Sequence, residues 1–253
     1  MADTVPDRVY LLMPQAMILA AGRGERLRPF TDQRPKPLLP VRGKPLIEWQ
    51  IEGLVRAGFD EIVVNGAWLA EPLESYLAQG QRWGIPLHWS REDPALGTAG
   101  GVVQALPFLT DPVFVVVSAD IHTTYAYELL RTRLERWRDS PGEEGADPPV
   151  LAHLVLVEEA HYPRDFSLDA EGRVTQPIGR AGTYGNIGLF RRSFFTPLKR
   201  GENADLGALL RNAVSRRQVS GEWTVSPWIN VGTLAEWQRA ENHPKEFDSC
   251  PSP

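Results

Sequence analysis

Short apolar segments alternate with segments of helical periodicity across the first 138 residues, and this alternation constrains the fold more than any other feature. Four segments are typical of buried strands, at residues 16–20, 61–65, 85–90 and 112–120. A segment of helical periodicity follows each strand, at 45–58, 69–80, 96–106 and 126–137. Strands joined through helices make right-handed crossovers and pair in parallel. We therefore predict an α/β fold, a Rossmann-like and mostly parallel sheet with helices on both faces.

The pattern changes after residue 138. Residues 139–149 read DSPGEEGADPP, a composition typical of a linker or mobile loop. Further strands are predicted at 150–157 and 183–190, a hairpin within 165–177 that turns at Glu171-Gly172, and helices at 206–214 and 234–242. We expect one domain over 16–241 with halves at 16–138 and 150–241, a flexible extension at 1–15 and a disordered tail at 242–253.

Composition and charge exclude several classes of partner. The 27 basic and 32 acidic residues give a net charge of −5, so a broad basic surface for nucleic acid is absent. No apolar run approaches the roughly 20 residues that a membrane-spanning helix needs. The single cysteine, Cys250, permits no internal disulfide, which suits a reducing compartment. We expect a cytoplasmic monomer that binds neither nucleic acid nor membrane.

The loop after the first predicted strand has the composition of an anion site. Residues 19–40 read LAAGRGERLRPFTDQRPKPLLP. Gly22 and Gly24 carry no Cβ that would keep a ligand from the backbone N–H groups, and Arg26 can form paired hydrogen bonds to phosphate. Lys36 stands between two prolines, which we expect to hold the backbone extended and present the ammonium from a stiff support, not from a helix. A fixed cation is suited to charge that develops during a reaction.

Two familiar phosphate motifs do not match this loop. The dinucleotide-binding fingerprint requires a third glycine where the chain has Leu27, and the P-loop requires a Gly-Lys-Ser/Thr sequence that is missing. For Arg23, Arg28 and Arg34, a solvated surface position is as good an interpretation as phosphate contact.

Two further features fall at the carboxyl ends of predicted strands, where ligands bind in open α/β sheets. The first is the glycine-rich turn LGTAGG at 96–101, and the second is Asp120, which ends the most apolar strand. A carboxylate at the end of a buried strand is costly unless it serves a purpose. The alternative is that Asp120 caps the next helix.

Together these stretches resemble the signature of the sugar-1-phosphate nucleotidyltransferases. The positions that match are Leu19, Ala20, Ala21, Gly22, Gly24, Arg26, Leu27, Pro29, Thr31, Pro35, Lys36, Pro37 and Leu38. The resemblance extends through LGTAGG and VVVSAD to WINVGT, and so covers residues 16–241. Within the family the chain is most similar to N-acetylmuramate-1-phosphate uridylyltransferases of cell-wall recycling. Mannose-1-phosphate guanylyltransferases and glucose-1-phosphate thymidylyl- or uridylyltransferases are the alternatives.

The resemblance implies that a sugar-1-phosphate oxygen attacks the α-phosphorus of a nucleoside triphosphate and that pyrophosphate leaves, with Mg²⁺ as cofactor. It makes residues 16–138 the nucleotide-binding half and 150–241 the sugar-binding half. It implies catalytic roles for Arg26, Lys36 and Asp120. The nucleotide-binding positions would be Ala20, Ala21, Gly22, Gly24, Asn65 and Gly97. Asp165 and Asn186 would face the sugar. Asp120 and Asn230 would bind the metal, and Trp68 could flank the nucleotide.

The chain departs from the family pattern at two positions. Ala119 precedes Asp120 where the family has glycine, and Asn230 stands where the family has aspartate. A site with one carboxylate should hold Mg²⁺ less tightly than a site with two. The added methyl of Ala119 would either crowd the sugar or be tolerated. These departures leave open a second hypothesis, a protein of the same fold that binds nucleotide sugars but has lost catalysis.

Overall fold

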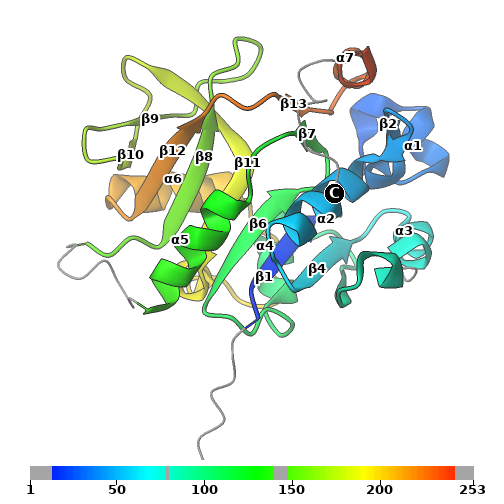
Figure 1. The fold of residues 1–253 in the computed structure, drawn as a ribbon, viewed down its shortest axis with the longest axis horizontal. Coiled ribbons are helices and arrows are strands. Elements are labelled where there is room, and N and C mark those ends of the chain that lie inside the picture. Colours follow the sequence, from blue (N-terminus) through cyan, green and yellow to red (C-terminus); the bar gives the residue numbers. More distant parts are fainter. Residues whose placement is uncertain (1–12, 78–79, 140–147, 243–253) are drawn as a thin grey trace, which may run out of the picture.

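The sheet is the centre of the molecule (Figure 1). The structure is a computed structural model that describes residues 13–77, 80–139 and 148–242. Within these residues the main sheet has nine strands. Seven of them run in the order β10-β9-β11-β6-β1-β4-β5, and β8 and β12 extend the sheet from β11.

The first half is built from parallel strands, as predicted. Strand β1 (Gln15–Leu19) pairs in parallel with β4 (Glu61–Gly66) and β6 (Val113–Ser118), and β4 pairs in parallel with β5 (Leu87–Arg91). The helices that follow these strands are α2 (Leu46–Arg56), α3 (Ala70–Leu77), α4 (Gly97–Ala105) and α5 (Glu128–Asp139). The apolar strand β6 lies in the interior of the sheet.

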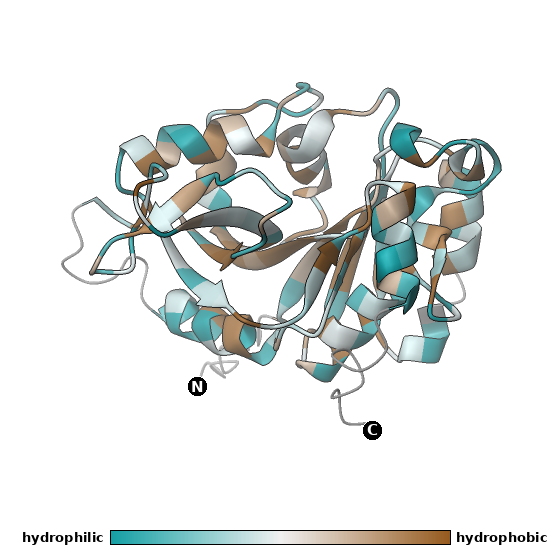
Figure 2. Cartoon of the chain, turned by 90° about the horizontal axis from the view of Figure 1, so that it is seen from above, coloured by the Kyte–Doolittle hydropathy of each residue, from teal (hydrophilic) through white to brown (hydrophobic). Residues whose placement is uncertain are grey.

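Helices cover both faces of the sheet. Along β1, Ala16 and Ile18 belong to a core cluster with residues of α2, α3 and α5, whereas Met17 belongs to a cluster with residues of α4 and of α6 (Leu206–Ser215). This alternation is the pleat of a strand buried on both sides. Figure 2 shows the apolar colouring concentrated along the strands, with hydrophilic residues on the outer sides of the helices. The predicted fold class is confirmed.

The second half joins the same sheet through one long strand, β11 (Ala181–Arg191). It pairs antiparallel with β6, with β8 (Ala152–Val157) and with β9 (Phe166–Leu168). The predicted hairpin is formed by β9 and β10 (Val174–Thr175), and β12 (Val219–Thr224) pairs in parallel with β8. The sheet is therefore mixed, with a parallel core in the first half.

Several short elements did not appear in the prediction. Strand β7 (Ile121–Thr123) pairs antiparallel with β13 (Trp228–Asn230), and β2 (Pro40–Val41) pairs with β3 (Lys44–Pro45). Strands of two or three residues are too short to show a period. The closing helix α7 (Leu234–Asn242) was predicted, and Figure 1 places it beside β2 and β13. A separate core cluster there contains Leu27, Leu39, Val41, Leu46, Ile229, Val231 and Ala240.

The predicted boundaries of the extension, the linker and the tail fall partly within the described residues. Strand β1 begins at Gln15, which is buried, so the last residue of the predicted extension belongs to the sheet. Three ranges lie outside the described residues: 1–12, 140–147 and 243–253. They contain most of the predicted extension, most of the predicted linker and nearly all of the predicted tail. Across the described ranges, no helix combines the length and the apolar character that crossing a membrane requires.

Candidate active site

The glycine loop leaves β1 at the carboxyl edge of the parallel strands. The backbone N–H of Ala20 donates to Asn65 Oδ1 at 2.7 Å, which fixes the start of the loop. Gly22 is exposed, and a Cβ at this position would have no heavy atom within 4 Å. The loop therefore leaves open space over the backbone at Gly22, as a phosphate cradle requires.

Gly24 packs directly against the predicted catalytic lysine. Its φ is +69°, and a Cβ would lie 2.9 Å from Thr31 Cγ2 and 3.1 Å from Lys36 Cβ. The hydroxyl of Thr31 donates to the Gly24 carbonyl oxygen at 2.9 Å. Only glycine suits both this dihedral angle and this spacing, so Gly24 serves the placement of Lys36 as well as the shape of the loop.

Lys36 is buried, with 8% of its surface exposed, and its Nζ forms an ion pair with Asp120 Oδ2. The prediction that it is presented from extended backbone and not from a helix was wrong. Pro35 is extended, but Lys36 begins a 3-10 turn, Lys36–Leu38, with Pro37 inside that turn. Proline tolerates the first turn of a helix, because the N–H it lacks has no partner there. The support is still stiff, although its geometry is helical.

Asp120 lies in the turn between β6 and β7, so it does not cap a helix. Its carbonyl oxygen accepts from Val231 N at 2.8 Å, and Asn230 pairs with Ile121 across β7 and β13. This brings together the two predicted metal ligands. Asp120 Oδ1 and Asn230 Oδ1 are both buried without a hydrogen-bond partner in the described structure. Such orphaned oxygens are the donor type that Mg²⁺ prefers.

The other departure from the family pattern is accommodated. Ala119 is 1% exposed and belongs to the core cluster on the α2 side of the sheet, and its N–H donates to Leu19 O at 2.9 Å. Its methyl group therefore packs in the core. Across the described ranges, no group of three or more His, Cys, Asp and Glu residues could hold a metal ion by itself.

Asn65 is part of a buried network that the sequence did not reveal. Its Nδ2 donates to Glu92 Oε1 at 2.5 Å, and Glu92 Oε2 accepts from Leu96 N at 2.8 Å. A Cβ at Gly101 would lie 2.6 Å from both Asn65 Nδ2 and Glu92 Oε1. Asn65 and Glu92 are 1% and 3% exposed. The network ties the start of the glycine loop to the turn before α4.

The glycine-rich turn packs on a neighbouring backbone more than it opens toward ligand. Gly97 has a φ of +73°, and a Cβ there would lie 2.6 Å from Ala204 O. The same carbonyl accepts from Ala99 N and Gly100 N, at 3.0 and 3.2 Å. The first turn of α4 therefore has a protein partner for these N–H groups, and Gly97 offers only its exposed side to a ligand.

Arg26 reaches toward the carboxyl-terminal segment. Its side chain is exposed on the loop, yet a Cβ at Gly232 would lie 2.6 Å from its Nη2. The adjoining turn is held by Glu236, whose Oε2 accepts from Gly232 N and Thr233 Oγ1, both at 2.9 Å. Tyr162 donates to Glu236 Oε1 at 2.8 Å. Burial tends to raise the pKa of Glu236, but these hydrogen bonds outweigh it and hold the pKa below its ordinary value.

The predicted sugar-facing residues lie on or beside β11. Asp165 is exposed, and its Oδ2 accepts from Thr183 Oγ1 at 2.9 Å and from Tyr184 N at 3.2 Å. Asn186 has a φ of +55° at an irregularity where the pairing of β11 with β8 shifts. Such bulges turn side chains out of the regular pleat and are frequent beside active sites. The next residue, Ile187, pairs with Val117, so Asn186 lies near the end of β6 and Asp120.

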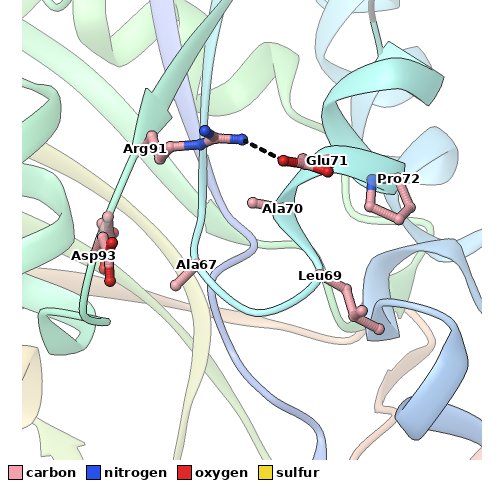
Figure 3. A pocket seen from close by; sticks show the side chains of 8 residues that line it. Ala67, Leu69, Ala70, Glu71, Pro72, Arg91 and Asp93 are labelled. Atoms are coloured by element: carbon pink, nitrogen blue, oxygen red, sulfur yellow. Dashed lines mark ion pairs between the residues drawn. The ribbon is translucent and has the colours of Figure 1, made fainter.

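A cavity of about 340 Å³ opens beside this edge, between the loop after β4 and the end of β5. Figure 3 shows its lining, with the Arg91 guanidinium directed at Glu71 across the opening. Their closest atoms, Arg91 Nη2 and Glu71 Oε1, are 4.0 Å apart. Glu92 lines the cavity and also bonds Asn65, so the cavity adjoins the glycine loop through one buried contact.

Comparison with known proteins decides the family. The chain is 40% identical over 237 residues to N-acetylmuramate alpha-1-phosphate uridylyltransferase of Neisseria meningitidis, which covers 90% of this chain and 96% of that protein. Residues 15–138 match the family described as nucleotidyl transferase. The chain belongs to the nucleotidyltransferase family. The predicted resemblance and the predicted activity of a sugar-1-phosphate nucleotidyltransferase are confirmed.

Other proteins match over part of the chain or in fold. The UTP–glucose-1-phosphate uridylyltransferase of Synechocystis is 44% identical over 159 residues, which is 57% of this chain and 38% of that protein. A Bacillus anthracis structure described as a glucose-1-phosphate thymidylyltransferase shares the fold with a TM-score of 0.75 at 20% identity, covering 92% of this chain and 98% of its own. HddC of Yersinia pseudotuberculosis, at 18% identity, has a TM-score of 0.71 and covers 91% and 99%.

In this nucleotidyltransferase the structure brings the predicted residues of the first half to one edge, and Asn230 joins them through β13. Glu92, Tyr162 and Glu236 were missed. Glu92 did carry a signal, because it directly follows a predicted strand at the carboxyl edge, as Asp120 does. Tyr162 and Glu236 carried no such signal, because their hydrogen bond joins residues that are 74 positions apart in the chain.

Proposed function

We propose that this protein transfers a uridylyl group from UTP to N-acetylmuramate 1-phosphate, giving the UDP-sugar and pyrophosphate. One observation carries this proposal: the similarity to the Neisseria uridylyltransferase spans 96% of that protein, and so includes both halves of the chain. The similarity to the Synechocystis uridylyltransferase, by contrast, covers 57% of this chain. A substrate assignment needs the half that would contact the sugar.

Lys36 is the group best placed to neutralise the reacting phosphates. A phosphate oxygen of the sugar attacks the α-phosphorus of the triphosphate, and negative charge crowds around that atom until pyrophosphate leaves. The Lys36 ammonium is held by its ion pair with Asp120 and by the packing of Gly24 on its stem. A cation that is already in place costs little reorganisation when charge develops, which is why its position favours catalysis.

Mg²⁺ fits beside it. Asp120 and Asn230 would hold the ion through the two buried oxygens that lack partners. When bound, the ion would neutralise and align phosphate oxygens. Because Asn230 contributes no charge, we expect the protein to retain less of the metal than a two-carboxylate site would.

The remaining site residues have supporting roles in this proposal. The backbone at Gly22 and Gly24 and the Arg26 guanidinium would hold the triphosphate, because they lie on one loop that is open at Gly22 and packs against Lys36 at Gly24. Ala20, Ala21 and the exposed side of Gly97 would contact the nucleoside, whereas Asn65 would act through its bond to Ala20. Asp165 and Asn186 would face the sugar. We expect the enzyme to act as a cytoplasmic monomer.

Pyrophosphate release from a panel of nucleoside triphosphates and sugar 1-phosphates tests the proposal. We expect the highest kcat/KM for UTP with N-acetylmuramate 1-phosphate, and its loss in Lys36→Ala. A preference for another pair, such as GTP with mannose 1-phosphate, would contradict the substrate assignment. Binding of UDP-sugar without turnover of any pair would support a binding protein that has lost catalysis.

A further inference from the structure

Trp68 lies outside the glycine loop and is linked to it through two residues, Thr31 and Arg23. It follows β4, and its indole Nε1 donates to the carbonyl oxygen of Thr31 at 3.1 Å. Thr31 in turn donates its hydroxyl to Gly24 O at 2.9 Å. The second linking residue is Arg23, whose guanidinium carbon lies 4.3 Å from the centre of a Trp68 ring. Arg23 precedes Gly24 in the chain, so both sets of contacts from Trp68 end at the same part of the loop.

The loop has few other constraints between its two ends. Its start is held by Asn65 at Ala20 N, and its end by Thr31 and Lys36 around Gly24. Between these points lies Gly22, where an added Cβ would have no heavy atom within 4 Å. The Arg23 side chain is 47% exposed and makes two contacts, a 3.7 Å ion pair with Glu25 of the same loop and the stack on Trp68. Of these two contacts, the stack joins the tip of the loop to the β4–α3 segment. A cation over tryptophan contributes about 0.5–1 kcal/mol at an exposed site.

We propose that Trp68 is a positioning residue for the phosphate-binding loop. It holds the tip at Gly22-Arg23 through the stacked guanidinium, and it holds Gly24 through Thr31. A loop that is already in its binding conformation does not lose that ordering entropy when the triphosphate arrives. This inference rests on the proposed use of the loop for a triphosphate, but it depends on no particular base or sugar.

The experiment measures the KM for nucleoside triphosphate, kcat and the dissociation constant of UTP by calorimetry. We expect Trp68→Ala to raise both the KM and the dissociation constant about tenfold, with kcat at saturation changing less than threefold. Trp68→Phe keeps a ring beneath Arg23 and loses the N–H donor, so we expect about a threefold rise. Arg23→Ala, on an exposed loop, should act on the same constants with little change in Tm.

A double-mutant cycle makes the test specific. If Arg23 and Trp68 act through one contact, the double variant should bind UTP about as weakly as Trp68→Ala alone. The matched control is Arg180→Ala, because Arg180 is also exposed, lies 4.6 Å from the Trp223 ring and pairs with an exposed glutamate, but belongs to the second half of the chain. We expect its UTP binding to equal that of the wild type.

Three results would overturn the proposal. The first is a change below twofold in UTP binding for Trp68→Ala, and the second is additive effects of Arg23→Ala and Trp68→Ala. The proposed function fails separately, because it requires turnover of UTP with the sugar phosphate, whereas the dissociation constants need no turnover. A fall in kcat that followed Tm across the variants, with unchanged UTP binding, would also contradict a positioning role.

Discussion

Asn65 in the first half lies near the end of β4, and Asn186 in the second half lies in the middle of β11, and their surroundings differ. Asn65 is 1% exposed, and both ends of its amide are bonded, to Ala20 and to Glu92. Asn186 is half-buried at an irregularity of β11 with a φ of +55°, and its side chain makes no hydrogen bond within the described residues. The amide of Asn65 is committed to the protein, whereas that of Asn186 is available to a ligand.

This contrast extends to the regions around the two residues. In the first half, Thr31, Glu92 and Trp68 hold the backbone of the glycine loop and of the turn before α4. In the second half, Asp165 is exposed, and among the residues that the structure describes its hydrogen-bond partners all belong to β11. We infer that the first half is built in advance for a phosphate chain, and that the second half leaves polar groups for a particular sugar.

The largest effect is expected at Lys36. Lys36→Ala removes the ammonium that would neutralise the reacting phosphates, and we expect kcat/KM to fall by about 100- to 1000-fold. Lys36→Arg should not rescue it, because a planar guanidinium is larger than the ammonium that pairs with Asp120 at this buried position. Pyrophosphate release is the measurement. Lys44→Ala is the control, since Lys44 pairs with Glu52 away from the site and should keep full activity.

The second-largest effect is expected at Glu92, in the first half of the chain. Glu92→Gln places an amide donor among two donors, Asn65 Nδ2 and Leu96 N, so one of the buried bonds is lost. We expect the free energy of unfolding to fall by about 1–3 kcal/mol. We expect the KM for UTP to rise about tenfold and the KM for the sugar phosphate to change little. Unchanged stability and unchanged UTP KM would mean that the network does not hold the loop.

Asp165→Asn tests the role of the second half of the chain. The amide oxygen can take the place of Oδ2, which accepts from both Thr183 and Tyr184, but the charge is removed from an exposed position. We expect about a fivefold rise in the KM for the sugar phosphate, which corresponds to about 1 kcal/mol, with the UTP KM unchanged. Steady-state kinetics with each substrate varied in turn is the measurement. A rise in the UTP KM alone would contradict the division between the halves.

A smaller effect is expected at Asn230. Asn230→Asp adds a carboxylate at the position that pairs with Ile121, next to Asp120, and we expect the Mg²⁺ concentration for half-maximal rate to fall about threefold. Magnesium titration of the rate measures this. Leu234→Asp is a matched control, since it adds the same charge on the exposed start of α7 and should leave the metal requirement unchanged. No difference between Asn230→Asp and wild type would remove Asn230 from the metal site.

The smallest effect concerns pH. The pKa of Glu236 is below its ordinary value in the folded protein, so its stabilising contribution is present above that ordinary value, near 4.5, and is lost as pH falls through the lowered value. Glu236→Gln should therefore lose less Tm than wild type on acidification from pH 7 to pH 4, by about 2 °C. Thermal unfolding at the two pH values checks this. Equal losses would show that Glu236 does not hold the Gly232 turn in its charged form.

The sequence predicted most of what continuous stretches encode. The strands and helices of the first half, the loop with Gly22 and Gly24, and Asp120 at a strand end could all be predicted, because each is a local pattern. Lys36 could be named as a candidate for phosphate contact, which stays a prediction, but it could not be placed in a 3-10 turn, because prolines permit both backbones. The β7–β13 pairing, which joins Asp120 to Asn230, could not be predicted, since it spans over a hundred residues and involves three residues on each side.

The position of Lys36 Nζ in a crystal structure with bound UTP tests the central claim most directly. We predict that the ammonium leaves or shares its ion pair with Asp120 and lies about 3 Å from a phosphate oxygen at or next to the α-phosphorus. An ammonium that stays on Asp120 alone or turns to solvent, with the triphosphate bound elsewhere, would contradict the account.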